Sequence, residues 1–307
     1  MKHDVAGDPM SGLRWTRKTR LKVAQQLTKL GIPIGKTSVG SLLKKMDFSL
    51  RVNRKQLCSG NQTPEDRYMR NQQFGYIRRI REQFTGQGLP VISVDTKKKE
   101  MIGNFKNNGA TWEQESRSVN DHDFLSDASG KGVPYGLYDV NKNTGFVNVG
   151  TSHDTAEFAV DSIVAWWQKT GKIQYGNTKQ LLILADSGGS NAAKSTLWKY
   201  YLQKKICTRF KLSVTVCHYP TGASKWNPIE HRLFGPISKH WEGIPLKTLE
   251  TVLKYIRKTA TATGLKVQAV ISRKKYEIKQ KLTKKQASEV KVEHHRKLSK
   301  WNYTIKP

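Results

Sequence analysis

Cysteine, long apolar runs and acidic side chains are all scarce in this sequence. The 307 residues include three cysteines, Cys58, Cys207 and Cys217, and no two of them form a C-x-x-C pair. Neither a zinc ribbon nor a disulfide framework is therefore expected. No apolar run is longer than 181–185, which is far too short to cross a bilayer, and the N-terminus lacks an apolar signal core. These absences favour a reducing, cytosolic setting.

The shortage of acidic residues leaves a large positive charge. There are 54 Lys and Arg residues against 24 Asp and Glu, a formal net charge of +30. Residues 1–90 carry 18 basic and 6 acidic side chains, and residues 254–307 carry 16 and 3, whereas residues 91–253 carry 20 and 15. This distribution predicts a globular core whose flanks bind a polyanion such as DNA or RNA. The alternative is that a high isoelectric point only keeps the protein soluble.

The N-terminal region has the pattern of two short helices separated by a turn. Thr16 is predicted to cap the first helix, the segment 31–35 breaks it, and Thr37 is predicted to cap a second helix that ends at Met46. This is the outline of a helix-turn-helix motif, in which the second helix reads the DNA major groove. The predicted DNA contacts on that helix are Thr37, Ser38, Ser41, Lys44 and Lys45. Helix pairs joined by a glycine turn also occur without a role in DNA binding, so that alternative stays open.

The rest of the chain is predicted to be mixed α/β. A helix capped by Thr63 runs to about Phe84, and the glycines and proline of 86–90 mark a domain border. Strands are predicted at 91–96, 134–140, 145–151, 180–185 and 212–217, with helices from Asp154 to Gly171, from Asn191 to about Thr208 and from Asn227 onward. This order suits a ribonuclease H-like fold, and other α/β sheets share it. The predicted domains are a helical DNA-binding region at 1–90, an α/β catalytic domain at 91–253 and a basic segment at 254–307.

Three acidic residues occupy positions that a two-metal phosphoryl-transfer site needs. Asp95 and Asp186 each end an apolar strand, and Glu230 lies at the start of a predicted helix. Carboxylates from strand ends and a following helix can converge on one point, where hard oxygen ligands suit Mg²⁺. Together the three predict a metal-dependent site at the carboxyl edge of the sheet.

Each carboxylate also has a purely structural explanation. Asp95 can form an ion pair with one of the lysines at 97–99, and Asp186 can cap the turn that follows it. Glu230 lies three residues after Asn227, with Pro228 between them, which is the spacing of a helix capping box. Any one of the three alone is more often structural, and only their joint order favours a catalytic site.

Four segments resemble the signature blocks of a family of bacterial insertion-sequence transposases, the ISAzo group, also called Rhodopirellula-type transposases. They are residues 91–100, 153–160, 185–191 and 224–234, and the similarity extends from about residue 7 to residue 305. The resemblance implies a ribonuclease H-like core in which Asp95, Asp186 and Glu230 are the DDE residues that bind two Mg²⁺ ions, for which Mn²⁺ can substitute. It further implies cleavage and strand transfer of the DNA of an insertion sequence.

The resemblance also implies partners and further contacts. Double-stranded DNA, both transposon end and target, is the expected substrate of a homo-oligomer at the bacterial nucleoid. The DNA contacts expected within the blocks are Lys97, Lys98, Lys225, Trp226, His231 and Arg232, whereas His153 and Asp154 are expected to support the site or contact DNA rather than bind metal. Members of the group carry a further helical segment upstream of residue 7, so an N-terminally truncated or split copy is expected.

Two other functions remain compatible with the residues. One is a ribonuclease H-like nuclease that makes no strand-transfer product, and the other is a non-catalytic DNA-binding protein derived from a transposase. The intact acidic triplet argues against the second. The long polar stretch 100–133 is either an ordered insertion that contacts substrate or a mobile loop. The lysine-rich residues 273–300 form either a solvated surface or a DNA-backbone contact.

Overall fold

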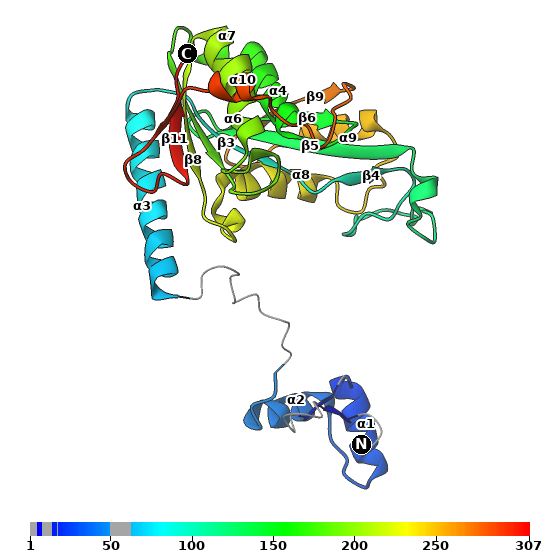
Figure 1. Cartoon of the computed structure of the whole chain (residues 1–307). Coiled ribbons are helices and arrows are strands. Elements are labelled where there is room, and N and C mark those ends of the chain that lie inside the picture. The colour runs from blue at the N-terminus through cyan, green and yellow to red at the C-terminus, as the bar shows by residue number, and fades with distance from the viewer. Residues whose placement is uncertain (1–4, 8–13, 17, 50–62) are drawn as a thin grey trace. The chain divides into compact units, whose positions relative to one another are not determined.

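The computed structural model describes residues 5–7, 14–16, 18–49 and 63–307 (Figure 1). It divides into two compact units, Met1–Leu57 and Cys58–Pro307. The division therefore falls near residue 57 and not at the predicted border of residue 90. The reason is the long helix α3 (Pro64–Gly86), whose Ile77 and Phe84 are buried against strands of the larger unit.

The smaller unit contains a two-stranded sheet and two packed helices. Strand β1 (Val5–Gly7) pairs antiparallel with β2 (Arg14–Thr16), so Thr16 lies in a strand and does not cap a helix. Helices α1 (Arg20–Lys29) and α2 (Lys36–Lys45) pack through Val23, Ala24 and Val39. Thr19 caps α1 by accepting a hydrogen bond from the Lys22 amide, and α2 starts after Gly35 without a side-chain cap. Two helices joined by a short turn are present as predicted, with both predicted caps displaced.

The larger unit is built on a nine-stranded mixed sheet. Its order is β10-β11-β8-β7-β3-β5-β6-β9, with β4 paired to β5 outside this path. The strands are β3 (Val91–Thr96), β4 (Glu100–Ile102), β5 (Gly130–Asp139), β6 (Thr144–Gly150), β7 (Gln180–Ala185), β8 (Ser213–His218), β9 (Lys266–Ser272), β10 (Val292–His294) and β11 (Asn302–Ile305). Strands β3, β7 and β8 run parallel to one another, so their carboxyl ends meet at one edge of the sheet.

Helices cover both faces of this sheet, and strand residues alternate between the two faces. On β7, Leu181 and Ile183 pack into one core with Trp166 and Trp198, whereas Leu182 packs on the other face with α3 residues. The first core is formed with α4 (Ala156–Trp166), α5 (Lys172–Tyr175), α6 (Thr196–Leu202) and α7 (Thr208–Phe210). A third core beside β6 is formed with α8 (Gly235–His240) and α9 (Leu249–Lys258), and a short helix α10 (Lys284–Ser288) lies near the C-terminus.

Several predicted boundaries within the larger unit differ from the structure. Thr155, not Asp154, caps α4, and a π-helical turn, Trp167–Gly171, carries the chain past Gly171 into α5. The helix predicted from Asn191 begins at Thr196, because Ser195 supplies its cap. Residues 254–307 are not an appendage, since β9 pairs with β6 and β11 pairs with β8.

Two of the three cysteines lie in the described part of the chain. Cys207 and Cys217 are buried free thiols, and Cys58 lies outside the described residues. Within the described part of the chain, no helix is both long and apolar enough to span a membrane.

Candidate active site

Asp95 and Asp186 lie side by side at the carboxyl edge of the sheet. Val94 of β3 is in register with Ala185 of the parallel strand β7, so the next residue of each strand is an aspartate. Neighbouring strands lie about 4.8 Å apart. Both aspartates line one pocket of about 400 Å³, together with Asp154 and the turn at 187–190. The topology therefore brings together two of the predicted ligands that are 91 positions apart in the sequence.

Asp95 is an uncompensated acid, which means that no positively charged side chain among the described residues pairs with its carboxylate. Burial, the charge of Asp186 and lesser contributions from Glu230 and Asp154 raise its pKa to about 7, against the lowering effect of a 2.7 Å hydrogen bond from the Thr96 amide. Among the described residues, no lysine forms an ion pair with it. The nearby Lys97 is buried, donates to Glu100 and lies 4.6 Å from the ring centroid of Trp241. The ion-pair explanation of Asp95 thus does not describe this structure.

The side-chain amide of Asn227, which was predicted to cap a helix, instead donates a hydrogen bond to Asp186. Asn227 donates from Nδ2 to Asp186 Oδ1 at 3.0 Å, and its own Oδ1 accepts the hydroxyl hydrogen of Ser93 on β3. Burial raises the pKa of Asp186, and the Asn227 hydrogen bond opposes that rise. Asn227 therefore connects β3 to the residue that follows β7, and this role was not predicted for either Asn227 or Ser93.

Glu230 has no capping partner. It begins the π-helical turn Glu230–Phe234, and the Asn227 side chain that would complete a capping box points to Ser93 and Asp186. The only contact between Asn227 and Glu230 that follows the helix pattern is between backbone atoms, at 3.1 Å. The Glu230 carboxylate is half-buried, and burial and the charge of Asp186 raise its pKa. Its position is thus better explained by the site than by the helix.

The carboxylates at this edge of the sheet suit a divalent cation, although they do not surround one common point. Within the described residues, no three carboxylate, histidine or thiol side chains converge closely enough to share a metal ion. Asp95, Asp154 and Asp186 line the pocket, and Glu230 is not among its lining residues but is near enough for its charge to raise the pKa of Asp95. Carboxylate oxygens are hard ligands that Mg²⁺ prefers, and a cation would relieve the repulsion that raises the pKa values of these acids. The residues fit divalent metal, and holding one ion among all three acids requires side-chain movement from this arrangement.

Asp154 lines the same pocket as Asp95 and Asp186, and its position in the sequence did not predict this. The Thr96 hydroxyl donates to Asp154 Oδ1 at 3.2 Å, and the negative charge of Asp154 contributes to the raised pKa of Asp95. Thr96 therefore contacts Asp95 through its amide and Asp154 through its hydroxyl. The signal in the sequence was the His153–Asp154 pair just before a helix.

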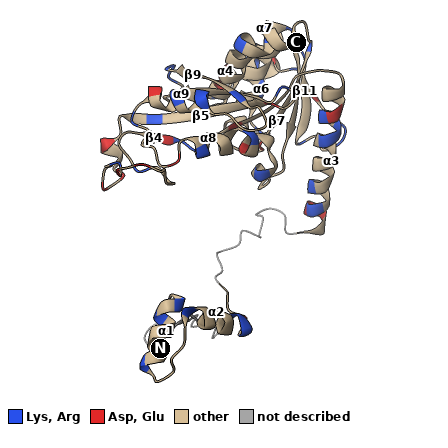
Figure 2. Ribbon diagram, turned by 180° about the vertical axis from the view of Figure 1, so that it is seen from behind, with Lys and Arg blue, Asp and Glu red and all other residues tan. Residues whose placement is uncertain are grey.

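The predicted DNA contacts around the pocket are mostly exposed. Lys98, Lys225, His231 and Arg232 are exposed, and Trp226 is 56% exposed with its ring edge packed on Phe74. Lys97 is the exception, because its amine is buried against Glu100. In the smaller unit, Thr37, Ser38, Ser41, Lys44 and Lys45 are all exposed on α2. Helix α3 also carries two groups of arginines, Arg67 and Arg70 near its start and Arg78, Arg79 and Arg81 further along (Figure 2).

The polar stretch after β4 is tied down at its base. Asn107 donates from Nδ2 to the carbonyls of Trp241 and Ile244, and the Ser129 amide donates to the carbonyl of Ile102. Its tip carries Trp112, which is fully exposed. The base of this segment is therefore ordered, and an exposed indole is available for contact with another molecule.

One family model matches this chain over its whole length, and several solved structures have a similar fold. The family model described as Rhodopirellula transposase DDE domain matches residues 1–307. The fold is similar to that of the Mos1 strand transfer complex, with 13% identity, a TM-score of 0.49 and coverage of 78% of this chain and 64% of that chain. It is also similar to Mos1 mariner paired-end complexes, one with Mn (14% identity, TM-score 0.46) and one with Mg (12% identity, TM-score 0.47), each covering 78% of this chain and 65% of the other. The chain thus spans less than two thirds of the length of those transposase chains. No curated protein sequence matches it.

Proposed function

Since this chain belongs to the transposase family described as Rhodopirellula transposase DDE domain, we propose that it cleaves DNA at the ends of an insertion sequence and joins those ends to target DNA. The observation that carries the proposal is the adjacency of Asp95 and Asp186 on parallel strands, with the charge of Glu230 close enough to act on Asp95 and, among the described residues, no cation paired with either aspartate. The strand order β6-β5-β3-β7-β8, antiparallel and then parallel, supports a ribonuclease H-like core.

Asp95, Asp186 and Glu230 would hold divalent metal, with Asp154 close enough to assist. We propose two Mg²⁺ ions, with Mn²⁺ as a substitute, because oxygen ligands in an open pocket accept either. When bound there, such ions lower the pKa of a water molecule and offset the charge that develops on phosphate oxygens.

The chain's own residues would supply position rather than a covalent nucleophile. Asn227 and Ser93 fix the Asp186 carboxylate, and the Thr96 amide fixes that of Asp95. Gly189, with φ of +67° and open space around its missing side chain, lets a phosphate approach the backbone of the turn after Asp186. In this one pocket a water molecule would attack the phosphodiester at the element end, and the P–O3′ bond would break to release the element's 3′-hydroxyl. That hydroxyl would later attack a phosphodiester of the target, whose own 3′-oxygen would leave as a hydroxyl.

Basic and aromatic residues around the pocket would hold the DNA strands. Lys98, Lys225 and Arg232 are exposed, lie within five residues of Asp95 or Glu230 in the sequence and can contact phosphates, and Trp226 offers an exposed ring. In the smaller unit, we propose that α2 reads the element end in the manner of a helix-turn-helix. Each of two element ends needs a catalytic pocket, so we propose that the DNA complex contains at least two copies of the chain.

The test is an assay that separates cleavage from joining. The purified chain is incubated with Mg²⁺ and labelled element-end DNA, and both shortened strands and branched joint products are measured. A transposase gives both products, whereas a nuclease gives cleavage alone. A non-catalytic DNA-binding protein gives neither, and either of these two results would refute the proposal.

A further inference from the structure

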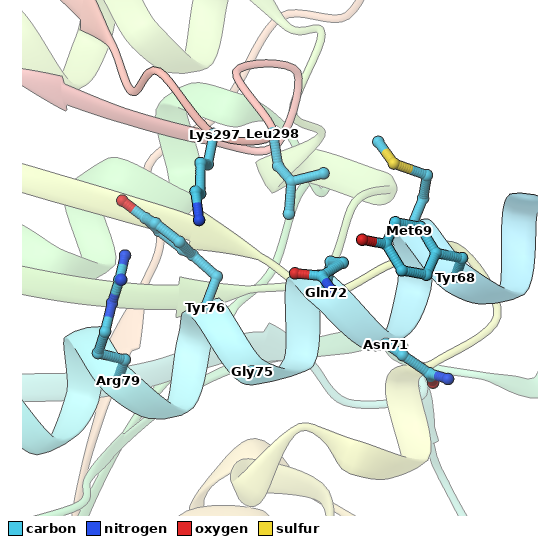
Figure 3. Close-up of a pocket in the computed structure, with 9 residues that line it drawn as sticks. All are labelled: Tyr68, Met69, Asn71, Gln72, Gly75, Tyr76, Arg79, Lys297 and Leu298. Atoms are coloured by element: carbon cyan, nitrogen blue, oxygen red, sulfur yellow. The ribbon is translucent and has the colours of Figure 1, made fainter.

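A groove of about 480 Å³ lies between α3 and the loop that carries Lys297 and Leu298 (Figure 3). Helix α3 contributes Tyr68, Gln72 and Arg79 to it, among others. The described residues that line it include two cations and two tyrosine rings, and none of them carries a carboxylate. These groups match a ligand that combines negative charge with a flat apolar face.

Gly75, in the middle of α3, is one of the residues that line this groove (Figure 3). Glycine destabilises a helix interior relative to alanine, so its presence calls for a reason. Packing within the chain does not supply one, because a side-chain carbon built at Gly75 would meet no atom within 4 Å. The missing side chain instead leaves the helix backbone open to a ligand.

The loop wall of the groove is held in a strained but fixed conformation. Leu298 has φ of +55°, a region that residues with a side chain seldom occupy and that is common at ligand-binding positions. Its carbonyl accepts hydrogen bonds from the amides of Trp301 and Asn302 and from Asn302 Nδ2. Asn302 in turn pairs with Gln73 of α3 through two hydrogen bonds, of 2.8 and 2.7 Å. The two walls are therefore joined, and the groove is preformed.

The same buried pair connects the groove to the catalytic edge. Gln73 Nε2 also donates to the His218 carbonyl at 2.8 Å, and His218 Nδ1 lies 2.9 Å from the Asp186 carbonyl oxygen. The next residue of α3, Phe74, packs on Tyr219 and Trp226 beside the pocket. A DNA strand that enters the catalytic pocket would thus have the groove within reach.

We propose that this groove binds one unpaired nucleotide of a DNA strand. Tyr68 is 63% exposed and offers a face for base stacking, while Arg79 and Lys297 bind the adjoining phosphate. The volume is that of a single small ligand, and a paired base could enter only by leaving its duplex. The identity of the strand as DNA rests on the proposed function, whereas the stacking site rests on the groove itself.

The test compares two DNAs on the full chain in EDTA, so that binding is measured without catalysis. One is a blunt duplex, and the other is the same duplex with a short 3′ or 5′ single-stranded overhang that contains 2-aminopurine. The wild type is expected to bind one of the overhang DNAs about tenfold more tightly than the blunt duplex. Binding should also change the 2-aminopurine fluorescence, because that signal responds to stacking.

Tyr68→Ala and Gly75→Leu are expected to remove the preference for the overhang while the affinity for blunt duplex stays within about twofold. Gly86→Leu is the matched control, because Gly86 also lies in α3 with open space around it but outside the groove. It should keep the preference. Thermal unfolding of each variant verifies that α3 has folded.

Three results would overturn the proposal. The wild type could lack any preference for an overhang, the groove variants could weaken both DNAs equally, or Gly75→Leu could change the oligomeric state and leave the preference intact. The last result would assign the groove to a second copy of the chain. Absence of DNA cleavage in the presence of Mg²⁺ would refute the proposed function and not the groove, so the two failures are distinguishable.

Discussion

The proposed catalytic pocket and the groove on α3 are lined by side chains of opposite charge. In the pocket, parallel strands bring Asp95 and Asp186 together, and the described residues supply an amide but no cation to balance them. In the groove, Arg79 and Lys297 meet aromatic rings and no acid. Each region leaves a charge that a ligand of the opposite sign would neutralise. The comparison teaches that the proposed catalysis and the proposed DNA binding depend on different residues, so the two roles can be tested separately.

The largest effect should come from breaking the acidic side alone. Asp95→Asn removes one charged ligand and keeps the shape of the side chain, so we expect DNA cleavage to fall by at least about a thousandfold. DNA binding at moderate salt should stay nearly unchanged, because the basic residues are untouched. Rates from gel assays and affinities from fluorescence anisotropy check both parts. Cleavage close to the wild-type rate in this variant would remove Asp95 from the site.

Glu230→Gln is the sharpest test of the third carboxylate. A capping role tolerates glutamine, whereas a metal ligand does not, and the Asn227 side chain is committed to Ser93 and Asp186. We expect cleavage to fall by about a hundredfold with no fall in the melting temperature. Both quantities should be measured on one preparation. A stable and fully active variant would return Glu230 to a structural role.

The pH dependence of the free energy of unfolding should reveal how much it costs to ionise Asp95 in the pocket. Burial and the charge of Asp186 raise the pKa of Asp95 from 3.8 to about 7, so the folded state holds this proton more tightly than the unfolded chain. The resulting stability is complete below about pH 4 and is lost as the pH rises through 7. At pH 8 without metal, Asp95→Asn should raise the free energy of unfolding by about 1–3 kcal/mol, and at pH 4 it should have little effect.

A bound divalent metal ion should offset this cost of ionising Asp95. Mg²⁺ is expected to raise the melting temperature of the wild type at pH 8 and to have a much smaller effect on Asp95→Asn. Differential scanning calorimetry at the two pH values, with and without Mg²⁺, measures all of these differences. A variant that is less stable than the wild type at pH 8 would contradict the account of Asp95 as an uncompensated acid.

The smallest effect is expected on the basic side, in the smaller unit. Replacing Lys44 and Lys45 with Gln should weaken binding to every duplex alike, with the slope of log affinity against log salt reduced by up to about 0.9 for each lost phosphate contact. Ser38→Ala should instead reduce only the preference for element-end sequence. Titrations over a salt series distinguish the two. Equal loss of affinity for all sequences in Ser38→Ala would argue against α2 as the recognition helix.

Local patterns predicted the elements that local physics controls. The apolar runs at 91–96 and 180–185 form strands at those positions, and Thr63 caps α3 by accepting the Asp66 amide, as expected. The acids at the ends of the two strands were identifiable because a charge at the end of a buried run is unusual. These features depend on alternation, capping and burial within a few neighbouring residues.

Partners that are distant in sequence were decided only by the tertiary structure. Asn227 has the spacing of a helix cap, yet its amide joins Ser93 to Asp186, and Lys97 binds Glu100 rather than Asp95. The C-terminal strand β11 pairs with β8, and its Asn302 meets Gln73 of α3. Period-two alternation marks a strand but not its neighbour, and a polar side chain satisfies whichever buried group the fold brings to it. The sequence by itself therefore determined which residues could perform chemistry, and the packing of the sheet determined which of them meet.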